Sequence, residues 1–383
     1  MSQVYDCIVV GTGGVGAATL FHLARRGARA IGVDRFAPGH DRGSSHGETR
    51  LFRLAYFEHE GYVPLLQRAR ELWLELGEQV GTTLYHELGI LEVGDRDGPV
   101  VGGVLESASR HDLLVEELSP SMVERRWPGF TIPAGQSAVF EPTAGYLSVE
   151  ACVEAHAQLA RAHGAVLDIG SEATTWSTDG DDVLVSTSRR EYRARRAVIT
   201  AGAWAPQLLG TVAFPLDVRR QSTFWFAADD RYGAASGMPA FFFEDTDGPP
   251  GHGHYGVPAL DRRGVKVARH HGGRPVDDPS ALDRTLDPAE LADATGFLAR
   301  CLPGVGGEMT HHAVCMYTNS PDGHFVVDRH SHAPQVQFAA GLSGHGFKFA
   351  SVLGEVLADL ALEGGTDHPI EFLGAQRFAN IGR

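Results

Sequence analysis

The chain opens with a short hydrophobic run that leads into a glycine-rich turn. Residues 5–10 predict a β-strand, and the helical pattern after the turn places Leu20 and Leu23 toward one face. A second hydrophobic run over residues 30–33 predicts another strand, which ends at Asp34. Strand, glycine turn, helix, strand and acid in this order predict a parallel α/β unit.

Beyond this unit the hydrophobic pattern alternates between helix and strand, except in the middle of the chain. We expect helices over residues 64–76, 149–163 and 350–363, and strands over residues 183–188, 197–200 and 336–340. Residues 214–300 are rich in turns and aromatic residues, which indicates an inserted mixed-β domain. Residues 43–53 have too little apolar content for a strand and too many glycines for a helix. The predicted fold class is therefore α/β (α+β overall), a discontinuous Rossmann-type domain with a mixed-β insertion.

The first glycine turn, with the sequence GTGGVG over residues 11–16, is a dinucleotide-binding fingerprint. Gly11 permits the tight turn, Gly13 lets a pyrophosphate approach the backbone, and Gly16 lets the helix pack closely on the strand. Asp34 can accept hydrogen bonds from a ribose. A second glycine turn over residues 341–346 precedes the last helix, so both turns could converge on one large cofactor such as FAD. A nicotinamide dehydrogenase is the competing interpretation.

Composition excludes several other classes of protein. A chain of 383 residues is long enough for two domains, and its formal net charge of −15 argues against a nucleic-acid binder. It contains no run of 18 apolar residues and no secretion signal, so we expect no membrane segment. The four cysteines are scattered without a CxxC pair, which fits a reducing compartment and no zinc site. We therefore expect a cytoplasmic protein without a metal.

The use of basic residues is uneven. Of the 33 basic residues, only Lys266 and Lys348 are lysines. A lysine provides a compact ammonium whose pKa the environment can change, whereas an arginine guanidinium stays charged. The two lysines are therefore candidate functional residues, although two chance surface lysines would explain the count equally well.

Several separated stretches resemble monomeric sarcosine oxidase, N-methyltryptophan oxidase and related flavin amine oxidases. The resemblance extends from end to end and includes, besides the fingerprint, residues 45–53 (SHGETRLFR), 62–65 (YVPL), 126–129 (RWPG), 201–204 (AGAW), 255–258 (YGVP), 315–318 (CMYT) and 344–349 (GHGFKF). It implies a D-amino-acid-oxidase-like FAD-binding domain made of residues 1–80, 145–213 and 310–383. Residues 81–144 and 214–309 would form the substrate domain.

The resemblance also implies roles for single residues. Cys315 matches the cysteine that bonds covalently to the flavin, and Lys266 matches the lysine that activates O₂ beside it. Arg53 and Lys348 match a pair that binds the substrate carboxylate, a role that suits a guanidinium fork beside a point charge. The implied catalytic residues are Lys266, His46, Arg50 and His270. The implied substrate-binding residues are Arg53, Lys348, Tyr255, Tyr317 and Gly344. The implied cofactor-binding residues are Gly11, Gly13, Gly14, Val15, Gly16, Asp34, Ser45, Thr49, Cys315, Gly346, Phe347 and Lys348.

The activity that the resemblance implies is oxidation of a secondary (N-methyl) amino acid. The C–N bond would become an imine that hydrolyses to formaldehyde and an amino acid, and O₂ would become H₂O₂. The partners would be the amino acid and O₂, with no nucleic acid or membrane, and the chain would be a monomer. The loop between Glu244 and Tyr255 is longer than in sarcosine oxidase, and Phe242 or Phe243 falls near a differently filled pocket position. These differences leave open a larger or cyclic substrate, such as N-methyltryptophan, pipecolate or a NikD-like substrate. Two other classes also stay open: a flavin dehydrogenase with an electron acceptor other than O₂, and a non-catalytic FAD-binding protein.

Overall fold

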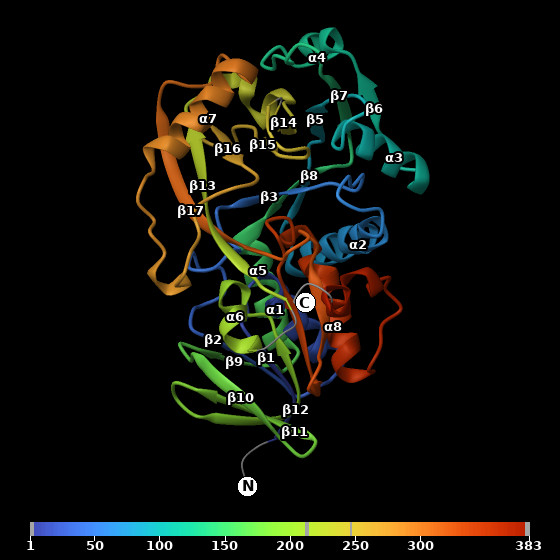
Figure 1. Ribbon diagram of the computed structural model, residues 1–383, viewed down its shortest axis with the longest axis vertical. Helices are drawn as coiled ribbons and strands as arrows, with labels where there is room; N and C mark the ends of the chain where they lie inside the picture. The colour runs from blue at the N-terminus through green and yellow to red at the C-terminus, as the bar shows by residue number, and fades with distance from the viewer. Residues whose placement is uncertain (1–3, 211–213, 246, 380–383) are drawn as a thin grey trace.

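The computed structural model describes residues 4–210, 214–245 and 247–379, which form three β-sheets with helices packed around them (Figure 1). A large sheet with its helices occupies the lower half of Figure 1, and a second large sheet occupies the upper half. The long strands β13 (Asp217–Phe226) and β17 (Met309–Asn319) run between the two halves. The predicted α/β fold class, with α+β character overall, is confirmed.

The first sheet has the strand order β10-β11-β12-β1-β2-β9. Two further strands extend it: β19 pairs with β12, and β18 pairs with β19. Its central pairs, β1 with β2 and with β12, are parallel, as are β2 with β9 and β12 with β19. The strands are β1 (Val4–Val10), β2 (Ala30–Asp34), β9 (Val166–Ile169), β10 (Ala173–Asp179), β11 (Asp182–Thr187), β12 (Glu191–Ile199), β18 (Val326–His330) and β19 (Ala333–Ala340).

Four helices pack beside this sheet: α1 (Gly14–Arg25), α2 (Tyr62–Val80), α5 (Val149–Ala162) and α8 (Ala350–Leu362). Helix α1 lies against α5 and α8, and Leu20 and Leu23 pack in one buried cluster with Leu353 and Val356 of α8. Burial of such apolar side chains is the main stabilising contribution to this part of the fold. The short helix α6 (Ala205–Leu209) follows the end of β12.

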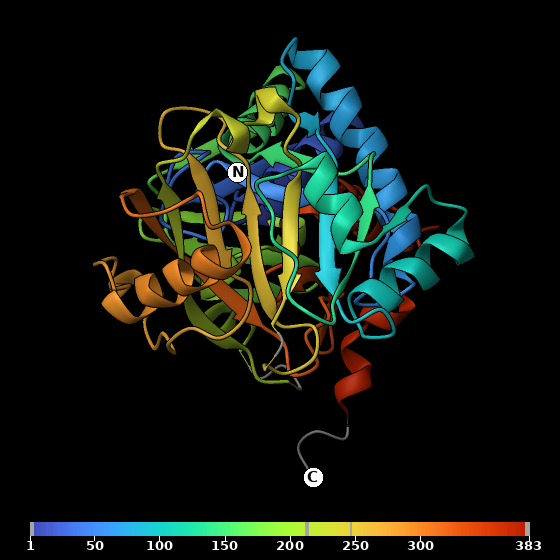
Figure 2. The same ribbon diagram turned by 90° about the horizontal axis from the view of Figure 1, so that it is seen from above.

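The second sheet has the strand order β17-β13-β16-β15-β14-β5-β7-β6, and Figure 2 shows it from above. All of its neighbouring strands are antiparallel except β14 and β5. Its other strands are β5 (Ile90–Gly94), β6 (Glu116–Leu118), β7 (Ser137–Glu141), β14 (Ala240–Glu244), β15 (Gly253–Val257) and β16 (Val265–Arg269). The helices α3 (Val101–His111), α4 (Pro120–Arg126) and α7 (Pro288–Cys301) pack on it.

A small sheet, β3-β8-β4, lies between the two large ones in Figure 1. It consists of β3 (Thr49–Phe52), β8 (Gly145–Ser148) and β4 (Tyr85–Glu87), all antiparallel. The expectation that residues 43–53 hold no strand is therefore wrong for Thr49–Phe52. The pairing with β8, nearly a hundred residues further along the chain, imposes the extended backbone, and a local pattern cannot reveal such a partner.

The predicted helices and strands are otherwise confirmed, with differences at their ends. Helix α2 begins at Tyr62 and continues to Val80, because Pro64 lies within its first turn and Gly81, at φ +67°, ends it. Strand β12 begins at Glu191, where its pairing with β11 starts. The described part of the chain also contains short 3₁₀ turns: η1 (Gly202–Trp204), η2 (Asp230–Tyr232), η3 (Ala234–Ser236), η4 (Pro279–Ala281), η5 (Phe347–Phe349), η6 (Glu371–Leu373) and η7 (Ala375–Phe378).

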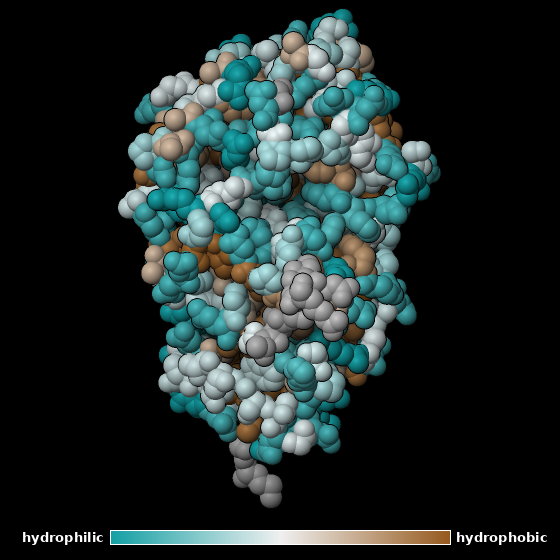
Figure 3. Space-filling view, in the orientation of Figure 1, coloured by the Kyte–Doolittle hydropathy of each residue, from teal (hydrophilic) through white to brown (hydrophobic). Residues whose placement is uncertain are grey.

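The surface of the molecule agrees with the polar composition. The face shown in Figure 3 is predominantly hydrophilic, with hydrophobic residues confined to small patches. No helix in the described ranges combines the length and the apolar character needed to cross a lipid bilayer.

Candidate active site

The first glycine turn joins β1 to α1 in a conformation that needs its glycines. Gly11 has φ +87°, and a Cβ atom at that position would lie 2.7 Å from the Thr200 carbonyl oxygen. A Cβ on Gly16 would lie 1.8 Å from the Gly11 carbonyl oxygen, so only glycine allows α1 to start this close to the strand. The N-cap of α1 is Gly13, which has no side chain to cap the helix, so the N-terminus of α1 can face a ligand.

Asp34 stands at the end of β2, beside this turn. Its carboxylate accepts hydrogen bonds from the Thr12 amide at 2.6 Å and the Thr12 hydroxyl at 3.2 Å, and from the Phe36 amide at 2.9 Å. These bonds fix the orientation of the carboxylate at the edge of the sheet. It lines the same cavity as the glycine turn.

A cavity of about 360 Å³ lies where the two glycine turns meet. Its lining includes Gly11, Gly13, Gly14, Val15, Asp34, Ser45, Arg50, Tyr317, Gly341, Gly344, Gly346 and Phe347. The turns are more than 300 residues apart in sequence, yet they face one cavity because β1 and β19 both pair with β12.

This cavity fits a dinucleotide such as FAD. An acidic group for the ribose and the N-terminus of α1 for a pyrophosphate lie along it, as in other dinucleotide sites. A Cβ on Gly14 would approach the Phe347 ring and the Ser45 hydroxyl to 3.0 Å. Glycine at this position therefore lets these two side chains lie close to the turn. The Gly14 amide donates to Ser45 Oγ at 3.2 Å, which anchors the segment before β3 to the turn.

A second, smaller cavity of about 50 Å³ adjoins the first. The two share Arg50, Tyr317, Gly344 and Phe347 as lining residues. The second is also lined by Leu51, Arg53, Glu58, Phe242, Tyr255, His270, His345 and Lys348. A small molecule in the second cavity would therefore lie beside the group bound in the first.

Arg53 is the first cation of the second cavity. Its guanidinium donates to both carboxylate oxygens of Glu58 at 2.8 Å and lies between the rings of Tyr56 and Phe57, at 4.3 and 4.2 Å from their centroids. Burial opposes its charge, but Glu58 and Glu92 outweigh that effect and raise the pKa of Arg53. Burial likewise disfavours the charge of Glu58, and Arg53 lowers the pKa of that carboxyl. Glu58 thus occupies the position that an added carboxylate would take.

Lys348 is the second cation. Its Nζ donates to the His345 carbonyl oxygen at 3.0 Å and to the Tyr56 hydroxyl at 3.3 Å. Burial, followed by the charge of Arg53, lowers the pKa of Lys348 to about 7. Its charge is therefore sensitive to an anion, because a bound carboxylate would favour the ammonium form.

Lys266 on β16 lies behind the small sheet and lines neither cavity. Its Nζ donates to the Gly47 carbonyl oxygen at 2.5 Å and to the carbonyl and hydroxyl oxygens of Thr49 at 3.1 and 3.0 Å. Burial, and then the charge of Arg50, lowers the pKa of Lys266 well below its usual value. Three acceptors around one nitrogen favour the ammonium form, which offers three donors.

Cys315 on β17 lies next to Arg50, and it also lines neither cavity. Arg50 Nη2 is 3.6 Å from Cys315 Sγ, which in turn is 3.4 Å from the Ser44 carbonyl oxygen. The adjacent residue Met316 lines the first cavity.

The remaining predicted residues divide between the cavities and the structure behind them. Tyr255 and Tyr317 line the second cavity with His270, whose pKa burial lowers well below its usual value. Thr49 binds Lys266 behind the cavities. His46 also lines neither cavity; burial and Arg50 lower its pKa to about 3, so it is neutral.

Three lining residues of the second cavity were not expected from the sequence: Leu51, Glu58 and His345. Tyr56, which accepts a hydrogen bond from Lys348 but does not line the cavity, was not expected either. His345 stands between two glycines of the second glycine turn, and that position was the one available signal. Glu58 and Tyr56 belong to the segment after β3, which carries no recognisable motif. Only the fold brings them to Arg53 and Lys348.

The glycine cradle, the acidic strand end and the adjoining cationic pocket define an FAD-dependent oxidoreductase. The family model described as FAD dependent oxidoreductase matches residues 6–360, and the chain belongs to this family.

Its relatives define the group more narrowly. The chain is 41% identical to monomeric sarcosine oxidase of Streptomyces avermitilis over 99% of both chains. It is 37% identical to N-methyl-L-tryptophan oxidase of Citrobacter koseri, over 93% of this chain and 94% of that one. Among solved structures, the open form of NikD, described as an unusual amino acid oxidase essential for nikkomycin biosynthesis, superposes with a TM-score of 0.84 at 26% identity, covering 97% of this chain and 98% of that one. The expected resemblance, the dependence on FAD and the oxidase class are thereby confirmed.

Proposed function

We propose that the enzyme oxidises a small secondary amino acid, with an N-methyl amino acid as the main substrate class. The observation that carries this proposal is the pair Arg53 and Lys348, two buried cations in a small cavity that shares a wall with the FAD cavity. Such a pair suits the carboxylate of an amino acid, which would replace Glu58 as the partner of Arg53. The similarity to sarcosine oxidase and N-methyl-L-tryptophan oxidase supports the same substrate class.

The protein contributes position and charge to this reaction. FAD, when bound, would take two electrons from the amine and transfer them to O₂, giving H₂O₂. Arg53 and Lys348 would hold the carboxylate, so that the amine points toward the shared wall of the two cavities. For this to happen, Glu58 has to release the Arg53 guanidinium that it now binds through two hydrogen bonds.

The volume of the second cavity favours sarcosine or a similarly small amino acid over N-methyltryptophan. About 50 Å³ is available within a wall made largely of Phe242, Tyr255, His270 and Tyr317. An indole ring would require this wall to move. A cyclic substrate of moderate size or a NikD-like substrate is the alternative. A peroxide-coupled assay with several amino acids separates these possibilities.

We further propose that Cys315 bonds covalently to FAD and that Lys266 serves the reaction with O₂. The support for Cys315 is the guanidinium of Arg50 beside its sulfur. The support for Lys266 is its burial as an ammonium with three acceptors, because a fixed cation stabilises negative charge that develops on oxygen. His46 and Arg50 would contribute charge and hydrogen bonds near the cofactor.

The domain division that we propose is residues 1–80, 145–213 and 310–383 for FAD and residues 81–144 and 214–309 for the substrate. Every strand of the first sheet comes from the first set, and every strand of the second sheet except β17 comes from the second set. We also propose a cytoplasmic monomer. This proposal is supported by the four cysteines, which are all free and buried, and by the 41% identity to a sarcosine oxidase that is named as monomeric.

The test is a peroxide-coupled assay of the holoenzyme in air with sarcosine, N-methyl-L-alanine, N-methyl-L-tryptophan and L-pipecolate. We expect H₂O₂ formation that is fastest with the smallest substrates. Reduction of the FAD absorbance without H₂O₂ would instead identify a dehydrogenase with another electron acceptor. No reduction with any of the four amino acids would reject the proposed function.

A further inference from the structure

Three buried polar residues lie in a row at the second cavity. Lys348 lies in η5, His345 precedes it in the second glycine turn, and Tyr56 lies in the segment after β3. The exposed fractions of the three residues are 7%, 8% and 1%. The proposed reaction uses Lys348 directly, whereas the other two have no assigned part in it.

The hydrogen bonds along this row run in one direction. His345 Nε2 is 3.0 Å from the Gly323 carbonyl oxygen, and a carbonyl only accepts, so Nε2 must carry the proton of the neutral ring. Burial lowers the pKa of His345 to about 3, which agrees with a neutral ring. Its Nδ1 is then an acceptor, and the Tyr56 hydroxyl donates to it at 2.5 Å. The hydroxyl proton of Tyr56 is thus directed away from Lys348.

The direction of the Tyr56 hydroxyl proton determines which atoms face Lys348 Nζ. With its proton committed to His345, the Tyr56 hydroxyl presents a lone pair to Lys348 Nζ, 3.3 Å away. The His345 carbonyl oxygen accepts a second bond from Nζ at 3.0 Å. Within residues 4–210, 214–245 and 247–379, no third acceptor lies within hydrogen-bond distance of this nitrogen, so one N–H is left for a ligand in the cavity.

We propose that Tyr56 and His345 form a positioning pair that aims the Lys348 ammonium at the substrate carboxylate. The inference rests on the proposed function, because it assigns the target of Lys348 to a carboxylate. Neither Tyr56 nor His345 transfers electrons or bonds to the substrate in this proposal. Their role is to fix one acceptor and one direction for Nζ.

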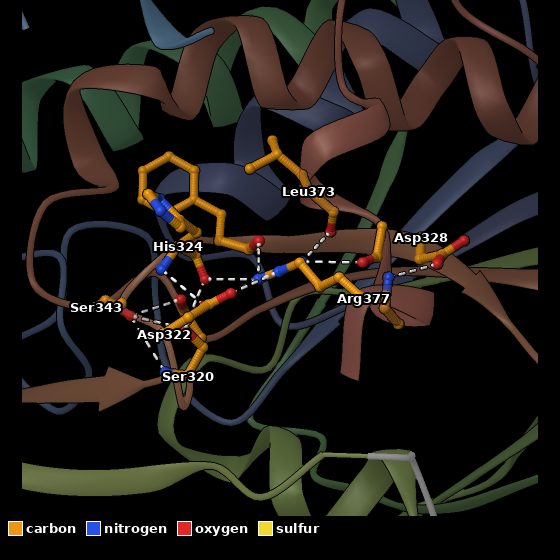
Figure 4. Close-up of polar contacts among 12 residues, drawn as sticks. Ser320, Asp322, His324, Asp328, Ser343, Leu373 and Arg377 are labelled. Carbon is orange, nitrogen blue, oxygen red and sulfur yellow. Dashed lines mark hydrogen bonds and ion pairs between the residues drawn. The ribbon is translucent and has the colours of Figure 1, made fainter. Parts of the chain in front are cut away.

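The far end of the row is itself held in place. Gly323 lies in the loop between β17 and β18, and Figure 4 shows the polar contacts that hold this loop. Arg377 donates to the Asp322 carboxylate at 2.8 Å and to the His324 carbonyl oxygen at 3.1 Å, on either side of Gly323. Ser320 Oγ in the same loop is 3.3 Å from Ser343 Oγ in the second glycine turn. The carbonyl that selects the His345 tautomer therefore has a fixed position.

The chain offers a matched control for Tyr56. Tyr62 belongs to the same buried cluster, with its ring centroid 5.4 Å from that of Tyr56. Its hydroxyl lies 3.4 Å from His324 Nδ1 and accepts a bond from the Phe325 amide at 3.2 Å, and it makes no hydrogen bond to Lys348. Tyr56→Phe and Tyr62→Phe thus each remove one buried hydroxyl, but only the first removes an acceptor of Lys348.

The experiment compares the two variants as holoenzymes. The first readout is the Kd of butanoate, the sarcosine skeleton with CH₂ in place of NH, from the shift of the FAD absorbance. The second readout is KM and kcat for the secondary amino acid that the wild type oxidises fastest. We expect Tyr56→Phe to raise both Kd and KM about tenfold, equivalent to about 1.4 kcal/mol, with a smaller change in kcat. Tyr62→Phe should change them less than about twofold.

A second substitution tests the tautomer. A glutamine at position 345 can accept from Tyr56 through its oxygen and donate to Gly323 through its nitrogen, whereas a leucine can do neither. We therefore expect His345→Gln to retain most of the butanoate affinity and His345→Leu to lose about as much as Tyr56→Phe. If His345→Leu does not fold, the comparison of the two tyrosine variants decides alone.

Equal Kd and KM values for Tyr56→Phe and Tyr62→Phe would overturn the inference. That result differs from a failure of the proposed function, in which the wild type oxidises no secondary amino acid. Weak butanoate binding to the wild type, unaffected by Tyr56→Phe, would also overturn the inference.

Discussion

The clearest test at the scale of a single residue concerns Lys266. Its side chain is buried, and Nζ donates to Gly47 and Thr49 and makes no ion pair among the described residues. We expect Lys266→Met to slow the reaction of reduced enzyme with O₂ by about 10²–10³-fold, the usual effect of removing one electrostatic stabiliser. Reduction by substrate should slow far less. Stopped-flow measurement of the two half-reactions separates them.

The control for Lys266 is Arg263→Gln. Arg263 is a nearby cation, but it is partly exposed and paired with Glu48 and Asp261. Its removal should leave both half-reactions within about twofold. Equal slowing of reduction and reoxidation in Lys266→Met would mean that Lys266 supports the structure and has no particular part in the oxygen reaction.

A covalent flavin at Cys315 is also a prediction about one residue. Acid precipitation of the wild type should leave the yellow colour in the protein pellet, because a thioether survives denaturation. Cys315→Ala should release all of the colour into the supernatant. Cys152→Ala, which changes another buried cysteine, should behave as the wild type. A colourless wild-type pellet would contradict the covalent bond.

At the scale of an element, the two faces of strand β14 have different roles, one in substrate selection and the other in stability. Side chains alternate across a strand, so Phe242 faces the second cavity, whereas Phe241 and Phe243 point to the opposite face of the second sheet and pack with Phe297. Phe242→Leu should enlarge the cavity and raise the kcat/KM of N-methyl-L-alanine relative to sarcosine by about tenfold or more. The ratio from steady-state assays checks this expectation.

Phe243→Leu on the same strand is the matched control. It removes the same atoms on the opposite face and should destabilise the protein without changing the substrate ratio, as thermal unfolding and the same assays will show. A change of the ratio in both variants would mean that general loosening of β14, and not the cavity wall, alters selection.

Strands and helices differ in how far the sequence predicts them. Helices α5 and α8 carry their own periodicity and end close to the predicted residues. Strand β3 was missed because Thr49–Phe52 becomes a strand only through its partner β8. The regular local spacing of apolar residues thus predicts helices, whereas a strand in a three-stranded sheet depends on residues far along the chain.

At the scale of the whole molecule, the sequence indicated most of the candidate site but not its internal contacts. Arg53 and Lys348 were expected as a pair, and both line the second cavity. That Glu58 already binds Arg53, and that Tyr56 binds Lys348, follows only from folding, since no periodicity or motif links these positions. Contacts between loops depend on the complete topology, and a single sequence does not reveal them.

The cationic site has a consequence for the stability of the whole protein through Glu92. This residue on β5 is fully buried, and its Oε1 lies 3.4 Å from Arg53 Nε. Neither carboxyl oxygen has a hydrogen-bond partner among the described residues. Burial outweighs the attraction of Arg53 and raises the pKa of Glu92 to about 8, so the folded protein holds this proton at neutral pH.

This proton makes stability depend on pH with a definite sign. Between the ordinary value of 4.5 and about 8, the folded state binds one proton that the unfolded state has released. The contribution of Glu92 to the free energy of unfolding therefore falls by about 1.4 kcal/mol per pH unit across this range. Glu92→Gln imitates the protonated form and should remove this decrease, so its advantage over the wild type should grow from pH 5 to pH 8.

Urea unfolding of both proteins at pH 5, 6, 7 and 8 measures the difference. The exposed Glu124 on α4 provides the control, because Glu124→Gln should leave the pH dependence unchanged. If Glu92 were instead an ionised partner of Arg53, Glu92→Gln would leave a buried guanidinium with one carboxylate fewer. The variant would then be less stable than the wild type at every pH above 5. The difference in the free energy of unfolding would therefore have the opposite sign to the expected one.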